Sequence, residues 1–194
     1  FTQTQVNSLI DNSVFVDREY GNFFPSVFLS YKINDFNNLN LSSSRRINRP
    51  AFTDMAPFVF FLDLEQALEG NVSLKPSYTN NFQLDYRYKS LNLTVQYTDE
   101  KDVISRFQPS IDNSSGFVTI RPANVDEQQT LSTIISYSFY PVSFWNLRLF
   151  STFAYTALKN NAAESSIDIT NSSLRFNMNN NFNLGNDFSF QVWG

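Results

Sequence analysis

Residues 81–98, NFQLDYRYKSLNLTVQYT, decide the fold. Apolar and polar side chains alternate from Phe82 to Lys89, and they alternate again from Leu91 to Thr98 after a turn near Ser90. Because successive side chains of a strand point to opposite faces, each half has one apolar and one polar face. A helical period of about 3.6 residues would instead bring Asp85 and Arg87 into an apolar stripe. The pattern therefore predicts a β-hairpin with one apolar and one polar face.

The apolar face of this hairpin could contact either of two environments. A soluble β-sandwich buries such a face against a second sheet, whereas an outer-membrane barrel turns it outward to lipid and keeps the polar face toward water. Each half of the hairpin is close to the roughly 9–11 residues that a tilted strand needs to cross a bilayer. Features in the rest of the sequence are needed to choose between these two architectures.

Composition excludes several classes of protein. The chain has 194 residues, a net charge of −4 and a pI near 4.8, which argues against a sequence-independent grip on nucleic-acid phosphates. It contains no cysteine and no histidine, so thiolate nucleophiles, disulfides, the usual general base and the commonest zinc ligand are all missing. We therefore expect neither an enzyme nor a cofactor, and we identify no catalytic, cofactor-binding or metal-binding residue.

The aromatic content is high while the mean hydropathy is low. Phenylalanine alone accounts for 21 residues, yet the mean hydropathy is −0.29. No apolar run approaches the roughly 18 residues of a membrane helix. Residues 1–8 lack the basic and apolar regions of a signal peptide, so the leader of an exported protein would have been removed or would lie outside these residues. Alternating strands explain many aromatics at a negative mean hydropathy.

The remaining strands repeat the alternation and are joined by two kinds of connection. Residues 1–22 are predicted to be the end of a strand and a loop, and alternation begins at Phe24. Short turns are predicted near 34–37, 90, 140–143 and 185–187, and long loops at 46–80, 108–125 and 158–166. Short turns that alternate with long loops are typical of outer-membrane barrels. The sequence thus predicts an all-β, antiparallel up-and-down meander of about eight to nine strands of a transmembrane β-barrel wall.

The two faces of these strands fit a membrane better than a sandwich. The apolar faces of the clear strands carry essentially no charge, as lipid requires. Aromatic residues gather near strand ends, as in interfacial girdles; they are Tyr31, Tyr86, Tyr88, Tyr97, Phe139, Tyr140, Phe144 and Trp145. We therefore favour the barrel and keep a soluble or surface-exposed β-sandwich binding module as the alternative.

Three motifs resemble a known family. They are SRRINRP from Ser44, GN with LKP from Gly70, and DVI from Asp102, with FFPSVFLSYKIN preceding them from Phe23. Their order and spacing resemble the outer-membrane β-barrel of TonB-dependent receptors, in the branch with a carboxypeptidase-regulatory-like N-terminal module. The motifs lie within residues 23–105, and the rest of the chain is similar by pattern only.

The resemblance implies a bacterial outer-membrane receptor that takes up a nutrient with energy from the inner membrane. It implies a barrel of about twenty-two strands filled by a plug, so residues 1–194 would be a partial barrel domain without the plug. The implied partners are outer-membrane lipid, the remainder of the barrel and the plug, an inner-membrane energy-coupling protein and an unknown small ligand. The short turns would be periplasmic and the long loops extracellular.

Several side-chain groups are candidates for a site. Arg45, Arg46 and Arg49 are expected to fasten the 46–80 loop rather than cradle an anion, and the 58–61 aromatic cluster to pack the loop rather than contact a ligand. The acidic residues Asp63, Glu65, Asp99, Glu100 and Asp102 lack EF-hand spacing and are interpreted as solvated loop charges. The glycosylation sequons at Asn40, Asn92 and Asn171 are discounted.

Overall fold

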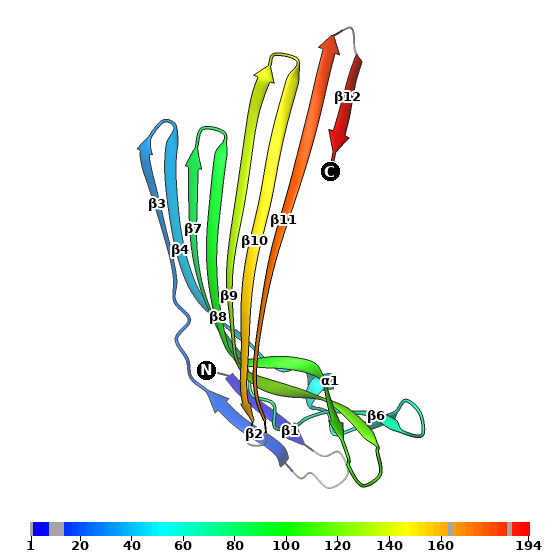
Figure 1. Cartoon of the computed structure of the whole chain (residues 1–194). Helices are drawn as coiled ribbons and strands as arrows, with labels where there is room; N and C mark the ends of the chain where they lie inside the picture. Colours follow the sequence, from blue (N-terminus) through cyan, green and yellow to red (C-terminus); the bar gives the residue numbers. More distant parts are fainter. Residues whose placement is uncertain (1, 8–13, 163–164, 186–187) are drawn as a thin grey trace. The chain divides into compact units, whose positions relative to one another are not determined.

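The computed structural model describes residues 2–7, 14–162, 165–185 and 188–194. These residues form one short helix and twelve strands (Figure 1). In chain order they are β1 (Thr2–Asn7), β2 (Val14–Tyr20), β3 (Ser26–Asn34), β4 (Asn37–Asn48), α1 (Phe52–Met55), β5 (Val59–Phe61), β6 (Gln66–Glu69), β7 (Ser77–Tyr88), β8 (Leu91–Ile111), β9 (Val118–Val142), β10 (Trp145–Ala162), β11 (Ser165–Gly185) and β12 (Phe188–Trp193). No helix among the described residues is long and apolar enough to cross a membrane.

The main sheet is a meander. Its strands follow the order β12-β11-β10-β9-β8-β7-β4-β3, so every sheet neighbour along this path is the next long strand of the chain. Strands β5 and β6 pair with each other away from this path, and β6 also pairs in parallel with β9. Strands β1 and β2 form a separate antiparallel pair. The meander confirms the predicted fold class and leaves the path open between β12 and β3 in the described part of the chain.

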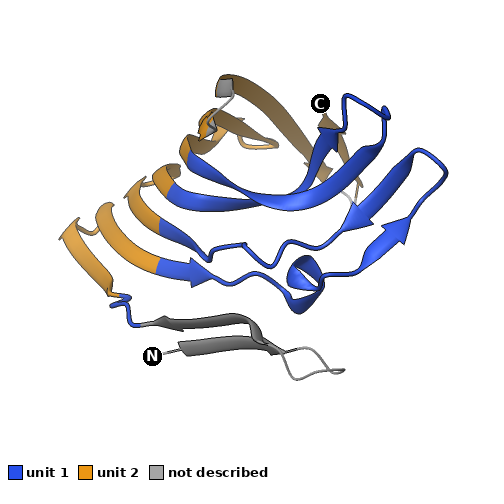
Figure 2. Ribbon diagram, turned by 90° about the horizontal axis from the view of Figure 1, so that it is seen from below, with its two compact units in different colours: residues 1–24, 46–79, 100–127 blue, residues 25–45, 80–99, 128–194 orange. Residues whose placement is uncertain are grey.

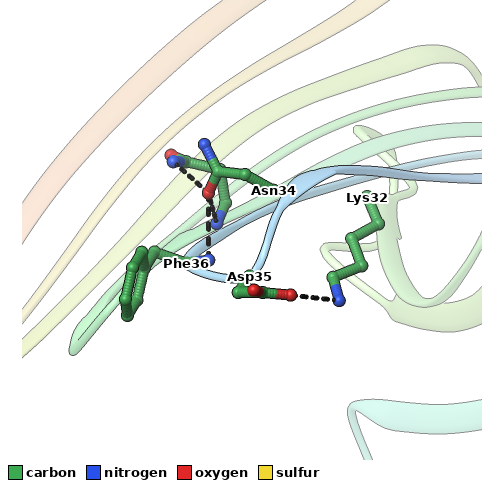
Figure 3. Close-up of polar contacts among 5 residues, drawn as sticks. Lys32, Asn34, Asp35 and Phe36 are labelled. Atoms are coloured by element: carbon green, nitrogen blue, oxygen red, sulfur yellow. Dashed lines mark hydrogen bonds and ion pairs between the residues drawn. The ribbon is translucent and has the colours of Figure 1, made fainter.

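Local turn chemistry explains the short connections. The side-chain Oδ1 of Asn34 accepts hydrogen bonds from the backbone N–H of Phe36 and of Asn37, at 2.9 and 3.0 Å (Figure 3). Asparagine favours turns because its side chain bonds the backbone two residues on. Lys89, in the next short turn, has a positive φ of 50°. These two turns lie where the sequence predicts them. The third short turn, predicted at 140–143, begins only after Val142, because strand β9 continues to that residue.

Strand register keeps the two faces separate. Trp145 pairs with Phe182, Leu149 with Met178 and Phe153 with Leu174, so apolar side chains of β10 and β11 share a face. The ring centroids of Trp145 and Phe182 lie 5.5 Å apart, and those of Phe182 and Phe190 lie 4.6 Å apart. This aromatic row crosses three strands near their short turns, which is where a barrel places an interfacial girdle.

The chain divides into two compact units (Figure 2). The strand unit comprises residues 25–45, 80–99 and 128–194, and the loop unit comprises residues 1–24, 46–79 and 100–127. The strand unit exposes its apolar face, since Leu29 is 61% exposed and Leu174 73% exposed. A sandwich would bury these side chains against a second sheet.

Three predicted segments differ from the structure. Residues 1–22, predicted as a strand end and a loop, contain β1 and β2. The predicted 108–125 loop is reduced to residues 112–117, because β8 runs to Ile111 and β9 begins at Val118. Likewise β10 and β11 run through most of the predicted 158–166 loop, whose residues 163–164 lie outside the described residues. These stretches pair through backbone hydrogen bonds, which do not require alternating side chains.

Candidate functional site

The segment predicted as the 46–80 loop has its own packed core. Met55 and Leu74 are 4% and 1% exposed and pack against Val72 and Ile104. Ala67 is also buried, and the short elements α1, β5 and β6 lie in this segment. The loop is therefore an ordered platform, and its sequence lacks alternation because its core comes from contacts between separate pieces of chain.

The Gly70–Asn71 motif closes this platform. A Cβ atom on Gly70 would lie 1.9 Å from the carbonyl oxygen of Ala56, so only glycine fits there. The backbone N–H of Asn71 donates to the carbonyl of Asp54 at 2.8 Å, and its side-chain amide donates to the carbonyl of Pro122 at 2.9 Å. The motif thus joins the end of α1 to β9.

Asn124 fixes the returning limb of the loop. Its Oδ1 accepts from the backbone N–H of Lys75 at 2.8 Å, and its Nδ2 donates to the carbonyls of Lys75 and Asp102 at 3.0 and 2.8 Å. The amide therefore occupies the place of a strand partner for Lys75, next to Pro76, which has no N–H to donate. Sequence reasoning missed Asn124, because nothing local marks a side chain that bonds backbone 49 residues away.

The three arginines predicted to fasten the loop do not all lie at one site. Arg49 lines a small cleft of about 230 Å³ with Asn48, Asp54, Ile104 and Arg106. Arg106 Nε lies 3.3 Å from Asp54 Oδ2, so it is Arg106 that ties α1 to β8. Arg45 belongs to the strand unit, whereas Arg46 and Arg49 belong to the loop unit. Nothing in the local sequence pattern indicated that Arg106 would contact this loop.

The 58–61 aromatic cluster is exposed, contrary to the prediction that it packs the loop. Phe58, Phe60 and Phe61 are 70%, 69% and 68% exposed. The prediction fails because the core is built from Met55, Ala67 and Leu74 on neighbouring turns, while β5 pairs only with β6 among the described residues. Phe61 retains one edge-on contact with Phe117 at 6.3 Å between ring centroids.

These rings border a groove of about 320 Å³ in the loop unit. Its apolar lining comprises Phe52, Phe58, Phe60, Leu68, Phe107 and Ile120, and Asp54, Glu69 and Arg106 provide charges beside it. Grooves of this size with apolar walls and a few charged groups are typical of small-ligand sites. The groove is the candidate ligand-contact site of this chain.

The interpretation of the acidic residues as solvated loop charges is wrong for Asp99, Glu100 and Asp102, which are half-buried within strand β8. Asp63 accepts from the backbone N–H of Glu65 at 2.8 Å, and Glu100 accepts from the Ser77 hydroxyl at 2.7 Å. Asp99 accepts from the Asn80 amide at 3.5 Å, while Asp102 adopts a positive φ of 52°. No group of three or more metal-ligating side chains occurs in the described part of the chain.

One carboxyl in the loop unit has a perturbed acidity. The Ser114 hydroxyl and backbone N–H, together with the Ser115 hydroxyl, donate to Asp112 and lower its pKa to about 2. Asp112 begins the short 112–117 turn, in which Gly116 has a φ of 72°. These bonds stabilise a turn and assemble no reactive group.

Polar side chains bond across the strands of the strand unit. Asp85 accepts from Gln83 Nε2 at 2.9 Å and from Thr94 Oγ1 at 2.7 Å, and Asn81 accepts from Gln96 and Thr98. The sequon residues Asn40, Asn92 and Asn171 all lie within strands. A face of bonded amides, hydroxyls and carboxylates suits the watery interior of a barrel.

Comparison with known proteins agrees with this architecture. The model of the outer membrane protein beta-barrel family matches residues 1–194. Comparison with curated proteins gave no match.

Two solved structures share the fold. A mutant of the ferric enterobactin receptor from Pseudomonas aeruginosa, in complex with enterobactin, is 12% identical with a TM-score of 0.52, covering 89% of this chain and 34% of the receptor. The siderophore receptor PirA from the same organism is 14% identical with a TM-score of 0.51, covering 89% and 38%. The chain thus spans little more than a third of these receptors.

The family match argues against the alternative of a soluble β-sandwich and places the protein in the outer membrane. It also agrees with the one-sheet meander and its exposed apolar face. The family is one of membrane barrels and not of enzymes. The chain belongs to the outer membrane protein β-barrel family.

Proposed function

We propose that this chain is part of the barrel wall of a TonB-dependent receptor that imports a small nutrient across the outer membrane. The observation that carries the proposal is the membrane-type meander with an ordered, ligand-sized groove in its one long loop. The fold shared with two siderophore receptors supports it. The remainder of the receptor would supply the other strands, a plug in the lumen and the contact with the energy-coupling protein.

In this proposal the loop unit is extracellular and its groove contacts the ligand. Phe58 and Phe60 offer exposed rings, and the Arg106 side chain, 62% exposed, offers a cation held by Asp54. Aromatic rings beside a guanidinium favour a ligand with both apolar and anionic groups. The short turns would face the periplasm.

Transport is tested in cells that carry the complete receptor. Uptake of the nutrient should require both the receptor gene and the energised inner membrane, so it should stop in cells that lack the energy-coupling protein. Uptake that continues at the normal rate in those cells would contradict the proposal. Passive diffusion through an unplugged pore would give that result.

Two neighbouring phenylalanines provide a matched test of the groove. Phe60 lines the groove and Phe61 does not, although their exposed fractions are 69% and 68%. Phe60→Ala should weaken ligand binding by roughly 5- to 30-fold, because one aromatic contact is worth about 1–2 kcal/mol. Phe61→Ala should leave binding within about 2-fold in titrations of the purified receptor. Equal losses in the two variants would remove the groove from the ligand path.

A further inference from the structure

Strand β5, in the loop unit (blue in Figure 2), has one edge that no other described strand covers. It pairs antiparallel with β6, and the backbone N–H of Leu62 donates to the carbonyl of Gln66 at 2.9 Å. Because antiparallel strands bond a given neighbour through every second residue, Val59 and Phe61 direct their backbone N–H and C=O groups away from β6. These backbone groups therefore line an open edge.

The side chains along this edge are those of an interaction surface. Residues 58–61, FVFF, are all exposed and none of them is charged. Natural sheets usually protect an edge with charges, prolines or bulges, and an exposed apolar edge strand readily pairs with another chain. We therefore expect the occupant of this edge to bring an extended backbone with apolar side chains.

The short length of the edge favours a small peptide over a folded protein. Val59–Phe61 spans about 10 Å at a rise of roughly 3.3 Å for each strand residue. A stable protein interface buries about 800 Å² on each partner, which so short a strand does not provide. An extended peptide of about five residues would pair along Phe58–Leu62, and its backbone would supply partners for the outward groups of β5.

The groove beside β5 selects the middle side chain of such a peptide. Phe60 lines this groove together with Leu68 on β6 and Ile120 on β9. Side chains directly opposite one another on paired strands share a face of the sheet. The peptide residue opposite Phe60 would therefore lie over the groove, and the apolar walls of the groove favour an apolar side chain at that position.

The charges at the two ends of the β5–β6 hairpin set the direction of the peptide. The tip of the hairpin, residues 62–65, carries Asp63 and Glu65 and no Lys or Arg. The base, beside α1, carries as many cations as carboxylates; they are Arg49, Arg106, Asp54 and Glu69. An antiparallel peptide places its ammonium group at the acidic tip and its carboxylate at the base, whereas a parallel peptide does the reverse. Charge complementarity therefore favours the antiparallel direction.

We propose that the ligand of the receptor is a short extended peptide that adds an antiparallel strand to the open edge of β5. Its backbone bonds Val59 and Phe61, and its middle apolar side chain enters the groove. Its amino-terminal end, with a basic side chain, lies at Asp63 and Glu65. The inference rests on the proposed function, in which the groove contacts the ligand, and it names the class of that ligand.

Backbone methylation of the peptide tests the strand pairing. Pentapeptides Lys-Ala-X-Ala-Ala, with X as Val, Leu, Ile, Met or Phe, are titrated against the purified complete receptor. The second and fourth residues pair with Phe61 and Val59 and direct their N–H groups to β5, whereas the third directs its N–H group away. Methylation of the fourth nitrogen should weaken binding at least about 10-fold. Methylation of the third nitrogen, the matched control, should weaken it less than about 3-fold.

Three results would overturn the proposal. The first is an equal loss of affinity from the two methylations. The second is the absence of binding up to about 1 mM for every choice of X. The third concerns a second copy of the receptor as the occupant: sedimentation would then show dimers of the peptide-free receptor that the pentapeptide dissociates.

Neutral variants of the hairpin tip test the direction of the peptide. The double variant Asp63→Asn with Glu65→Gln should bind the lysine pentapeptides about 3- to 10-fold more weakly. Acetylated pentapeptides with glutamine in place of lysine should bind the variant and the unaltered receptor within about 2-fold of each other. Asparagine keeps the side-chain oxygen that accepts from the backbone N–H of Glu65 at 2.8 Å, so the turn is preserved. Equal changes for both kinds of peptide would overturn the assigned direction.

Peptide binding and transport can fail separately. Strand-paired binding to a receptor whose uptake needs no energised inner membrane would support this inference and contradict the transport proposal. Energy-dependent uptake of another nutrient by a receptor that binds none of the pentapeptides would contradict this inference alone.

Discussion

At Gly70 the chain passes so close to itself that no side chain fits. An added Cβ would meet backbone atoms of Ala56, with the carbonyl oxygen at 1.9 Å and the carbonyl carbon at 2.8 Å. Gly70→Ala should therefore displace the α1 limb and cost about 1–3 kcal/mol or more, as overpacking does. Limited proteolysis of the folded receptor should show faster cleavage within residues 46–79.

Gly116 provides the control for this prediction. Its φ is 72° and an added Cβ would have nothing within 4 Å, so Gly116→Ala meets only the backbone penalty of about 1–2 kcal/mol. Its effect should stay local to the 112–117 turn. Faster cleavage within residues 46–79 in Gly116→Ala than in Gly70→Ala would contradict the close-packing argument.

At the scale of a strand, successive residues of β8 are predicted to face lipid and the barrel lumen in turn. Leu93 lies on the apolar face, and Thr94 lies on the polar face with its hydroxyl 2.7 Å from Asp85 Oδ1. Leu93→Arg should destabilise the barrel by about 2–4 kcal/mol in lipid, whereas Thr94→Arg should cost far less. Urea titrations of the complete receptor folded in lipid vesicles measure both. Equal costs would contradict a lipid-facing apolar face, and a larger cost for Thr94→Arg would indicate the opposite orientation.

The loop is the second element with a testable role. Removing residues 54–69 from the complete receptor takes away Met55, Ala67 and the groove, so assembly or uptake should fall. Removing only residues 113–115 shortens an exposed turn and should leave both unchanged. Assembly is followed by heat-modifiable mobility and uptake by accumulation of the nutrient. A fully assembled 54–69 deletion with normal uptake would deny the loop its role.

At the scale of the whole molecule, the two ends of the meander are predicted to face different compartments. The β9–β10 turn at Ser143 should be periplasmic and the 112–117 turn extracellular. A cysteine at Asn113 should react with a membrane-impermeant reagent on intact cells, and a cysteine at Ser143 should react only after the outer membrane is opened. Residues 1–194 contain no cysteine that would compete for the reagent. The reverse labelling pattern would invert the topology and place the groove in the periplasm. A further turn, at Asn186, lies outside the described residues.

The sequence by itself determined the two-faced strands, most of the short turns and the class of fold. Alternation from Phe82 to Thr98 and turn residues such as Asn34 act through near neighbours, so they can be read from the chain. Tertiary structure decided how far β8 and β9 extend, because polar strands are specified by the backbone of their partners. It also decided the candidate site, where Asn124 bonds Lys75 and Arg106 meets Asp54. Such contacts join residues about fifty positions apart, and the long-range packing that pairs them leaves no periodic mark on the sequence.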